Sequence, residues 1–426
     1  MSKRIASFVL LVLIALVLHH RQRKNENIGL AAYGRELLGI HGQKPGRKQY
    51  LDFLRFLAVV LVIVVHTMNP AGVELMEAEE TMLAAPALPT QAELNLLWLL
   101  RNIVKGIAAM ALSCNLLFIM ISGALLLPCR EEPPGEFYLK RFSRVLIPLV
   151  GYYLYYLLIN DSLFFYPASI WEAVKTIISG PNGYVPHFWM AYLLLGLYIA
   201  VPFQRRMLKD LPESLIKGMA LMVLGGSAVK VLLILAGCGL PSNAISYAPS
   251  LFGWEGIFFW GYFLTLPCCR KYDKYLLIGG GISAVIIACL FCGWANAAAV
   301  AANYSPFTIL TASGIFVLFM RREEKRRGKK GHPVLNAVIQ VGNKYSFSIL
   351  LIHWFVLFIV VEQKMGLHCL VFGTYGVFAA VMLQVVVTLG VSFGFALVFD
   401  QTVLFVMQKG WDGVVEGIRR MAGKRR

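Results

Sequence analysis

Tyr50-Leu-Asp-Phe-Leu-Arg-Phe-Leu-Ala-Val-Val-Leu-Val-Ile-Val-Val-His-Thr-Met68 is the stretch that decides the fold class of this chain. Nearly all of its residues are apolar, and it is long enough to cross a bilayer as one helix. Three ionisable residues, Asp52, Arg55 and His66, interrupt it. A charge in the hydrocarbon core costs at least ~2.5–3.5 kcal/mol on insertion scales, so these residues need partners and a reason to be there.

The spacing of Arg55 and His66 places both on one helix face. A separation of eleven residues brings them within ~20° of one another around the helix and ~16 Å apart along its axis, so one elongated ligand can touch both. Simpler interpretations remain open. Asp52 and Arg55, at i and i+3, can be an interfacial ion pair, and His66 can be a hydrogen-bonded packing residue.

The composition excludes an ordinary soluble domain. Of the 426 residues, 58% are hydrophobic and 15% are charged, which is typical of an all-α, polytopic membrane protein. The net charge of +17 does not indicate a nucleic-acid partner, because the basic residues lie between apolar spans and not on one module. We therefore expect membrane lipid, and no nucleic acid, among the partners.

Ten apolar segments predict ten transmembrane helices, at residues 50–68, 106–127, 145–160, 187–203, 215–237, 251–267, 275–295, 304–320, 346–361 and 376–399. The linker at 19–50, the alternate connections and the tail after Gln408 contain 32 Lys and Arg residues, with Lys217 at the start of the fifth span included, against 4 in the opposite loops. This asymmetry predicts cytoplasmic N and C termini. We expect a multi-pass protein of a bacterial plasma membrane. His66 then lies toward the outside, and residues 69–100 form an acidic outer loop.

Three regions follow from this pattern. Residues 1–47 contain a short apolar run, at 5–18, and a basic linker. The run is too short to span comfortably, and we interpret it as an interfacial or marginal extra segment. Residues 48–402 form the membrane domain, and residues 403–426 a basic cytoplasmic tail.

Candidate binding residues occur at both ends of the spans. Arg141 and Arg144 at the cytoplasmic end of span three share a helix face, with Lys140 beside them. Arginine donors suit phosphates, but a positive-inside anchor explains the same residues. On the outer side, His187 is a candidate substrate contact, although an aromatic belt explains its neighbours.

Three further polar residues interrupt later spans. Ser346 and His353 lie in span nine and Glu255 lies early in span six. They are candidate substrate contacts. Core hydrogen bonding remains an alternative for His353, and an ion pair with Lys230 is the interpretation we prefer for Glu255.

Five motifs, in chain order, resemble the membrane acyltransferase 3 family. They are Asp52-Phe-Leu-Arg55 with His66 after ten further residues, Phe118-Ile-Met-Ile-Ser-Gly123, Arg141-Phe-Ser-Arg144 before Pro148, the segment 187–202 beginning His-Phe-Trp-Met-Ala-Tyr, and Tyr345-Ser-Phe-Ser-Ile-Leu-Leu-Ile-His353. The segment 187–202 is especially similar to the branch of surface-polysaccharide O-acyltransferases. The resemblance covers roughly residues 48–400, and residues 1–45 have no counterpart in it.

The resemblance implies transfer of an acyl group, acetyl above all, from cytosolic acyl-CoA to a hydroxyl of a glycan or small polar acceptor, without a metal. Arg141 and Arg144 would bind CoA phosphates. His66 would be the general base or a transient acyl carrier, and Arg55, held by Asp52, would orient the donor. An exporter or flippase for a polysaccharide or lipid-linked precursor is the alternative, because such proteins also line pathways with buried charges. A purely structural subunit would explain neither Arg55 nor His66.

Overall fold

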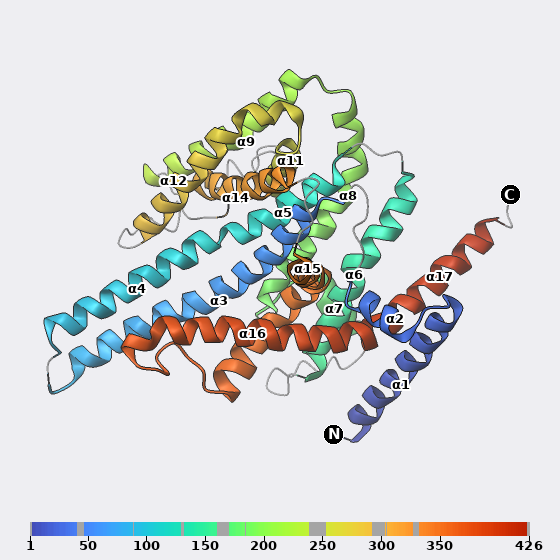
Figure 1. The fold of residues 1–426 in the computed structure, drawn as a ribbon, viewed down its shortest axis with the longest axis horizontal. Coiled ribbons are helices and arrows are strands. Elements are labelled where there is room, and N and C mark those ends of the chain that lie inside the picture. The colour runs from blue at the N-terminus through green and yellow to red at the C-terminus, as the bar shows by residue number, and fades with distance from the viewer. Residues whose placement is uncertain are drawn as a thin grey trace.

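The computed structural model describes residues 2–40, 47–87, 89–128, 132–159, 170–183, 185–237, 253–291, 303, 305–326 and 332–423. Within these ranges all regular secondary structure is helical, and no strand occurs. The predicted all-α fold is therefore confirmed. Figure 1 shows long helices packed into one elongated bundle.

One helix, α3 (Gln49–Ala84), contains the stretch quoted above and lies at the centre of the bundle. It packs against α4 (Gln91–Ala111), α5 (Ser113–Leu126), α14 (Pro306–Lys325), α15 (Pro333–Phe355) and α16 (Val377–Phe399). Its apolar side chains are mostly buried there, including Leu54, Ala58 and Ile63. The helix is surrounded by protein, which lets it hold ionisable side chains away from lipid.

The predicted outer loop at residues 69–100 is wrong in extent. Helix α3 continues through Pro70 to Ala84, and α4 begins at Gln91. Thr90 and Glu93 form a capping box at the start of α4, which satisfies backbone N–H groups at that helix end. Arg101 pairs with Glu79 at 2.7 Å and joins the two helices. The acidic residues of the predicted loop therefore lie on a helical hairpin, which is the long α3–α4 pair in Figure 1.

Seven helical segments within the described ranges are long and apolar enough to cross a membrane: Gln49–Ala84, Gln91–Leu126, Pro186–Lys209, Glu213–Leu233, Pro267–Leu290, Pro333–Lys364 and Thr374–Arg420. A multi-pass membrane protein is the plain consequence. The count of ten spans and the cytoplasmic termini stay predictions.

The remaining helices complete the bundle. They are α6 (Pro134–Ile159), α7 (Ile170–Ser179), α8 (Trp189–Lys209) after a 3₁₀ turn at Pro186–Phe188, α9 (Glu213–Leu235), α11 (Trp254–Phe263), a 3₁₀ turn at Pro267–Tyr272, and α12 (Asp273–Phe291). Two π-helical segments, Val356–Lys364 and Asp400–Leu404, follow α15 and α16, and a 3₁₀ turn at Thr374–Gly376 precedes α16. π-Helical turns are frequent at functional sites.

Close helix packing explains the glycine of the second motif. A Cβ added to Gly123 in α5 would lie 1.7 Å from the Phe258 carbonyl oxygen, and one added to Gly261 in α11 would lie 2.0 Å from that of Met120. The two backbones therefore touch through reciprocal glycines, as small residues allow in membranes. This contact holds α5 beside the site.

The two terminal regions meet on one side of the bundle. Helices α1 (Ser2–Asn25) and α2 (Leu30–Leu37) precede α3, and α17 (Phe405–Gly423) ends the described chain. Helix α1 packs against α17 and against the π-helical turn Asp400–Leu404, as Figure 1 also shows. Apolar side chains of α1, such as Leu10 and Leu16, are exposed. The interfacial placement expected for residues 5–18 stays a prediction.

Candidate active site

Helices α3 and α15 bring the polar residues of two distant motifs together. Arg55 Nη1 donates a hydrogen bond to Asn343 Oδ1 at 2.6 Å, and the rings of His66 and His353 lie 5.2 Å apart. The two pairs occur in the same order on both helices, so α3 and α15 run parallel. Parallel directions are what alternating spans one and nine require. We call the Arg55 side the basic end and the His66 side the histidine end of α3.

The histidine end collects three histidines from three segments. His187, which precedes α8, places its ring 5.3 Å from that of His353. His187 and His353 are buried, whereas His66 is partly exposed. Sequence analysis singled out all three side chains, and the structure brings them into one cluster.

Two ring nitrogens of this cluster are buried without a hydrogen-bond partner. His353 Nδ1 lies 2.7 Å from the Leu350 carbonyl oxygen, and His187 Nε2 lies 2.9 Å from that of Leu351. A carbonyl only accepts, so each of these nitrogens carries the proton. Among the described residues, nothing donates to His353 Nε2 or His187 Nδ1. Each is a hydrogen-bond acceptor, and a hydroxyl is the donor that would satisfy it.

Trp354, next to His353, forms a wall of the cluster. Its ring stacks on His187 at 5.6 Å with an interplanar angle of 10°, and meets His66 edge-on at 5.1 Å. The sequence does not distinguish Trp354 from other tryptophans of membrane spans, so it predicts no role for it. Across the part of the chain that the structure describes, no group of three His, Cys, Asp or Glu side chains is arranged to hold a metal ion.

At the basic end, the three predicted donor-binding residues differ in environment. Arg144 in α6 is exposed and makes no hydrogen bond or ion pair with any described residue. Arg141 is half-buried, and its Nε lacks a partner. Lys140 instead forms surface ion pairs with Glu132 and Glu136, both at 3.4 Å. Arg144 is thus the member best placed to meet a ligand.

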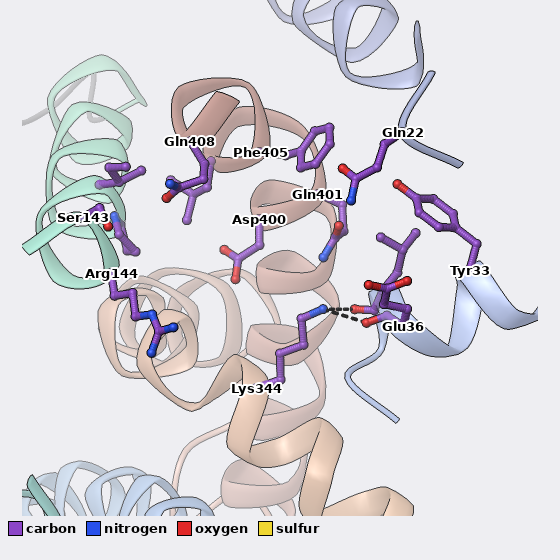
Figure 2. A pocket seen from close by; sticks show the side chains of 14 residues that line it. Gln22, Tyr33, Glu36, Ser143, Arg144, Lys344, Asp400, Gln401, Phe405 and Gln408 are labelled. Carbon is purple, nitrogen blue, oxygen red and sulfur yellow. Dashed lines mark hydrogen bonds between the residues drawn. The ribbon is translucent and has the colours of Figure 1, made fainter. Parts of the chain in front are cut away.

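Arg144 lines a cavity of about 330 Å³, which we call the mouth pocket (Figure 2). Its walls come from α1, α2, α6, α15, the turn Asp400–Leu404 and α17. Polar side chains from four of these elements, Gln22, Tyr33, Lys344 and Asp400, face it. The volume lies at the lower end of the range for ligand pockets, ~300–1,000 Å³.

Tyr198 of α8 connects the arginines of the basic end. Its hydroxyl lies near Ser122 of the second motif, and it is close enough to Arg55, Arg141 and Arg144 to interact with their charges. Sequence analysis gave Tyr198 no role, although it lies within the fourth motif. The three motif arginines therefore all lie within electrostatic range of this one phenol.

The predicted partner of Arg55 is wrong. Asp52 accepts a hydrogen bond from Arg47 Nε at 2.6 Å, and no ion pair joins it to Arg55, which bonds Asn343. The i, i+3 spacing permits both arrangements, and packing against α15 decides between them. Asp52 fixes Arg47 just before α3, and a role of Asp52 in the reaction stays a prediction.

Two other predicted substrate contacts, Ser346 and Glu255, lie on α15 and α11. Ser346 is buried and donates to the Asn343 carbonyl at 2.9 Å, within its own helix. Glu255 lies in the first turn of α11, and its ion pair with Lys230 stays a prediction. Neither residue belongs to the histidine cluster by contact.

Asp400 is a site residue that sequence analysis did not find. Its two carboxylate oxygens accept hydrogen bonds from Ser348 at 2.6 Å and from Tyr152 at 3.0 Å. It begins a π-helical turn and lines the mouth pocket. A carboxylate at the end of an apolar span was the available signal, but the span was taken to end one residue earlier.

Prolines within helices mark three residues of the site. Pro70, Pro148 and Pro202 each lie four residues after a site residue, namely His66, Arg144 and Tyr198. A proline has no N–H, so the carbonyl four residues earlier loses its usual helical partner and the helix can bend there. The backbone at all three residues is therefore less constrained than in a regular helix.

A family model described as an acyltransferase domain, that of the acyltransferase 3 family, matches residues 48–399. The chain belongs to the acyltransferase 3 family. No curated protein and no solved structure matches it. Acyl transfer is the general activity of an acyltransferase 3 protein, and it implies a donor of the acyl group. The histidine cluster and the arginines lie within the matched range, whereas α1, α2 and Asp400 lie outside it.

Proposed function

We propose that this chain is an O-acyltransferase that moves an acetyl group from cytosolic acetyl-CoA to a hydroxyl of a cell-surface glycan, in a bacterial plasma membrane. One observation carries the proposal: helix α15 joins the mouth pocket, which Lys344 lines together with Arg144, to the cluster of three histidines, to which His353 belongs. The ~16 Å between Arg55 and His66 suits a donor with a long flexible arm.

In the proposed reaction, His66 removes the proton of the acceptor hydroxyl. The hydroxyl oxygen attacks the thioester carbonyl, the carbon–sulfur bond breaks, and the proton passes from His66 to the leaving thiolate. An alternative route has the His66 ring accept the acyl group first and then lose it to the hydroxyl. The exposed part of the His66 side chain allows either route.

His187 and His353 suit the acceptor. Their unpartnered nitrogens accept hydrogen bonds from neighbouring hydroxyls of a polyhydroxylated substrate. The Trp354 ring gives such a substrate a flat apolar surface beside His66. A glycan supplies both the hydroxyls and the apolar sugar face.

The deciding experiment uses purified protein in liposomes with radiolabelled acetyl-CoA and candidate surface polysaccharides. Label should move to the glycan and be released by mild base, as an O-ester is. Absence of transfer from acetyl-CoA to every hydroxyl acceptor, with correctly folded protein, would refute the proposal. Export of unmodified polysaccharide by the same liposomes would instead support the exporter.

The proposal also requires donor and acceptor to approach from opposite faces. We expect a membrane-impermeant maleimide to label Glu79→Cys in whole cells. It should label Glu136→Cys only after permeabilisation. Both residues are part of helices near the two ends of the bundle, and Glu136 is 52% exposed. Labelling of both from outside would remove the transmembrane arrangement.

A further inference from the structure

The N-terminal segment, residues 2–40, precedes the matched family domain, and the proposed reaction assigns it no role. One set of contacts anchors it through His19. The His19 ring stacks on Phe405 at 3.8 Å with an interplanar angle of 8°. His19 Nε2 donates to the Gln401 carbonyl at 2.8 Å, and His19 Nδ1 accepts from the Tyr33 hydroxyl at 2.7 Å. Burial raises the pKa of Tyr33, which keeps that hydroxyl protonated as a donor.

A second set of contacts fixes the end of α2 on α15. Lys344 Nζ donates to the carbonyls of Glu36 and Leu37, at 3.0 and 2.6 Å, and the Tyr345 hydroxyl donates to the latter at 2.7 Å. Gly39 follows with a φ of +76°, and a Cβ there would lie 2.7 Å from Lys344 Cδ. Only glycine allows this turn to lie against the lysine. The segment is thus built onto the family domain at two separate places.

Docked in this way, the segment forms one wall of the mouth pocket, opposite Arg144 (Figure 2). Gln22 points its amide group into the pocket. Its Nε2 donates to Glu26 at 3.0 Å, whereas its Oε1 is buried and has no hydrogen-bond partner among the described residues. A buried acceptor of this kind is unfavourable unless a ligand supplies an N–H or O–H donor.

We propose that residues 2–40 are part of the donor site, and that Gln22 Oε1 recognises an N–H group of the donor's nucleotide. The inference rests on the proposed function. Arg144 contacts a phosphate on the α6 side of the pocket, and the purine base with its exocyclic amino group lies toward Gln22. A cavity of about 330 Å³ accommodates one end of the donor and leaves the acyl arm outside it.

The charges in the pocket agree with this orientation. Asp400 and Glu36 also line it, and their carboxylates disfavour phosphates in the middle of the pocket and along the α2 wall. Asp400 is already bonded by Ser348 and Tyr152. Lys344, the other cation of the pocket, is already bonded to the Glu36 and Leu37 carbonyls. The free guanidinium of Arg144 is therefore the place for the anionic part, and the wall at Gln22 is the place for the base.

Comparing two acyl donors distinguishes loss of nucleotide recognition from a general loss of structure. Acetyl-CoA carries the nucleotide, and S-acetylpantetheine lacks it. In the full-length protein, Gln22→Met keeps the side-chain size and removes the acceptor, so we expect the KM for acetyl-CoA to rise about threefold to tenfold. The KM for S-acetylpantetheine and both kcat values should stay unchanged. Gln91→Met, at the start of α4 and outside the pocket, is the matched control.

A second variant, His19→Ala, removes the hydrogen bonds to Tyr33 and Gln401 that hold the wall, and it leaves the Gln22 side chain itself in place. It should raise the KM for acetyl-CoA and leave that for S-acetylpantetheine unchanged. Equal kinetics of wild-type and both variants with acetyl-CoA, or equal losses with both donors, would overturn the inference. Failure of the wild-type protein to use acetyl-CoA at all would instead refute the proposed function.

Discussion

The two ends of α3 differ in how their polar atoms are satisfied. At the basic end, Arg55 is bonded to Asn343 and Asp52 to Arg47. At the histidine end, His187 and His353 each use one ring nitrogen on a backbone carbonyl and leave the other without a donor. Groups bonded within the protein hold a geometry, whereas groups without partners are available to a substrate.

The arginines also differ in whether protein groups satisfy their guanidinium groups. Arg55 and Arg205 are committed to protein partners, the second through the Leu126 carbonyl at 2.6 Å and the Glu132 carboxylate at 3.6 Å. Arg144 has no such partner among the described residues and faces the mouth pocket. We therefore expect chemistry at the histidine end, donor binding at Arg144, and support from Arg55 and Arg205.

The largest expected effect comes from the histidine end. His66→Ala should lower the rate of acyl transfer ~10²–10⁴-fold, the usual contribution of a general base, while thermal unfolding and acetyl-CoA affinity stay unchanged. His332→Ala, an exposed histidine before α15, is the matched control. Wild-type transfer by His66→Ala would remove the catalytic assignment and with it the contrast between the two ends.

At the mouth pocket we expect a smaller effect, confined to the donor. Arg144→Ala should weaken acetyl-CoA binding roughly tenfold, since a charge-assisted contact contributes ~1.5–3 kcal/mol, and adding Arg141→Ala should weaken it further. The KM for the acceptor should hardly change. Isothermal titration in detergent measures the donor affinity. Arg206→Ala, exposed on α8, serves as the control, and an equal loss there would mean that only net charge matters.

Removing a hydrogen bond to Asp400 should lower the stability of the fold and leave donor binding unchanged. Ser348→Ala removes a 2.6 Å hydrogen bond to this carboxylate, so the free energy of unfolding should fall by about 1.5–3 kcal/mol. Thermal unfolding in detergent would show this as a lower Tm, with kcat changed little. Thr402→Ala, which removes an exposed hydroxyl in the same turn, should leave Tm unchanged. A loss of donor affinity without any loss of stability would move Ser348 into the binding site.

The smallest expected effect concerns the backbone of His66. Pro70→Ala restores an N–H that can bond the His66 carbonyl and regularises α3. We expect a few-fold loss of kcat together with a higher Tm, because alanine is favoured over proline inside a helix by about 3 kcal/mol. Unchanged kcat in the stabilised variant would show that the freer backbone at His66 has no part in the reaction.

The sequence by itself determined a good part of this protein. Apolar runs of bilayer length predict membrane helices, and the period of a single helix places Arg55 and His66 on one face. The order of the motifs gave the family. These features depend on neighbours along one chain segment, so they can be read without a structure. The same local rules failed where helices extend past the membrane, as α3 does beyond Pro70.

Only the tertiary structure decided which distant residues meet. His66, His187 and His353 become one cluster because α3 and the 3₁₀ turn Pro186–Phe188 both pack against α15. Asp52 pairs with Arg47 for the same reason, since Arg55 finds Asn343 on a helix far along the chain. The docking of residues 2–40 on the mouth pocket joins segments hundreds of positions apart. Helical periodicity carries no information about such partners, which are chosen by side-chain packing between helices.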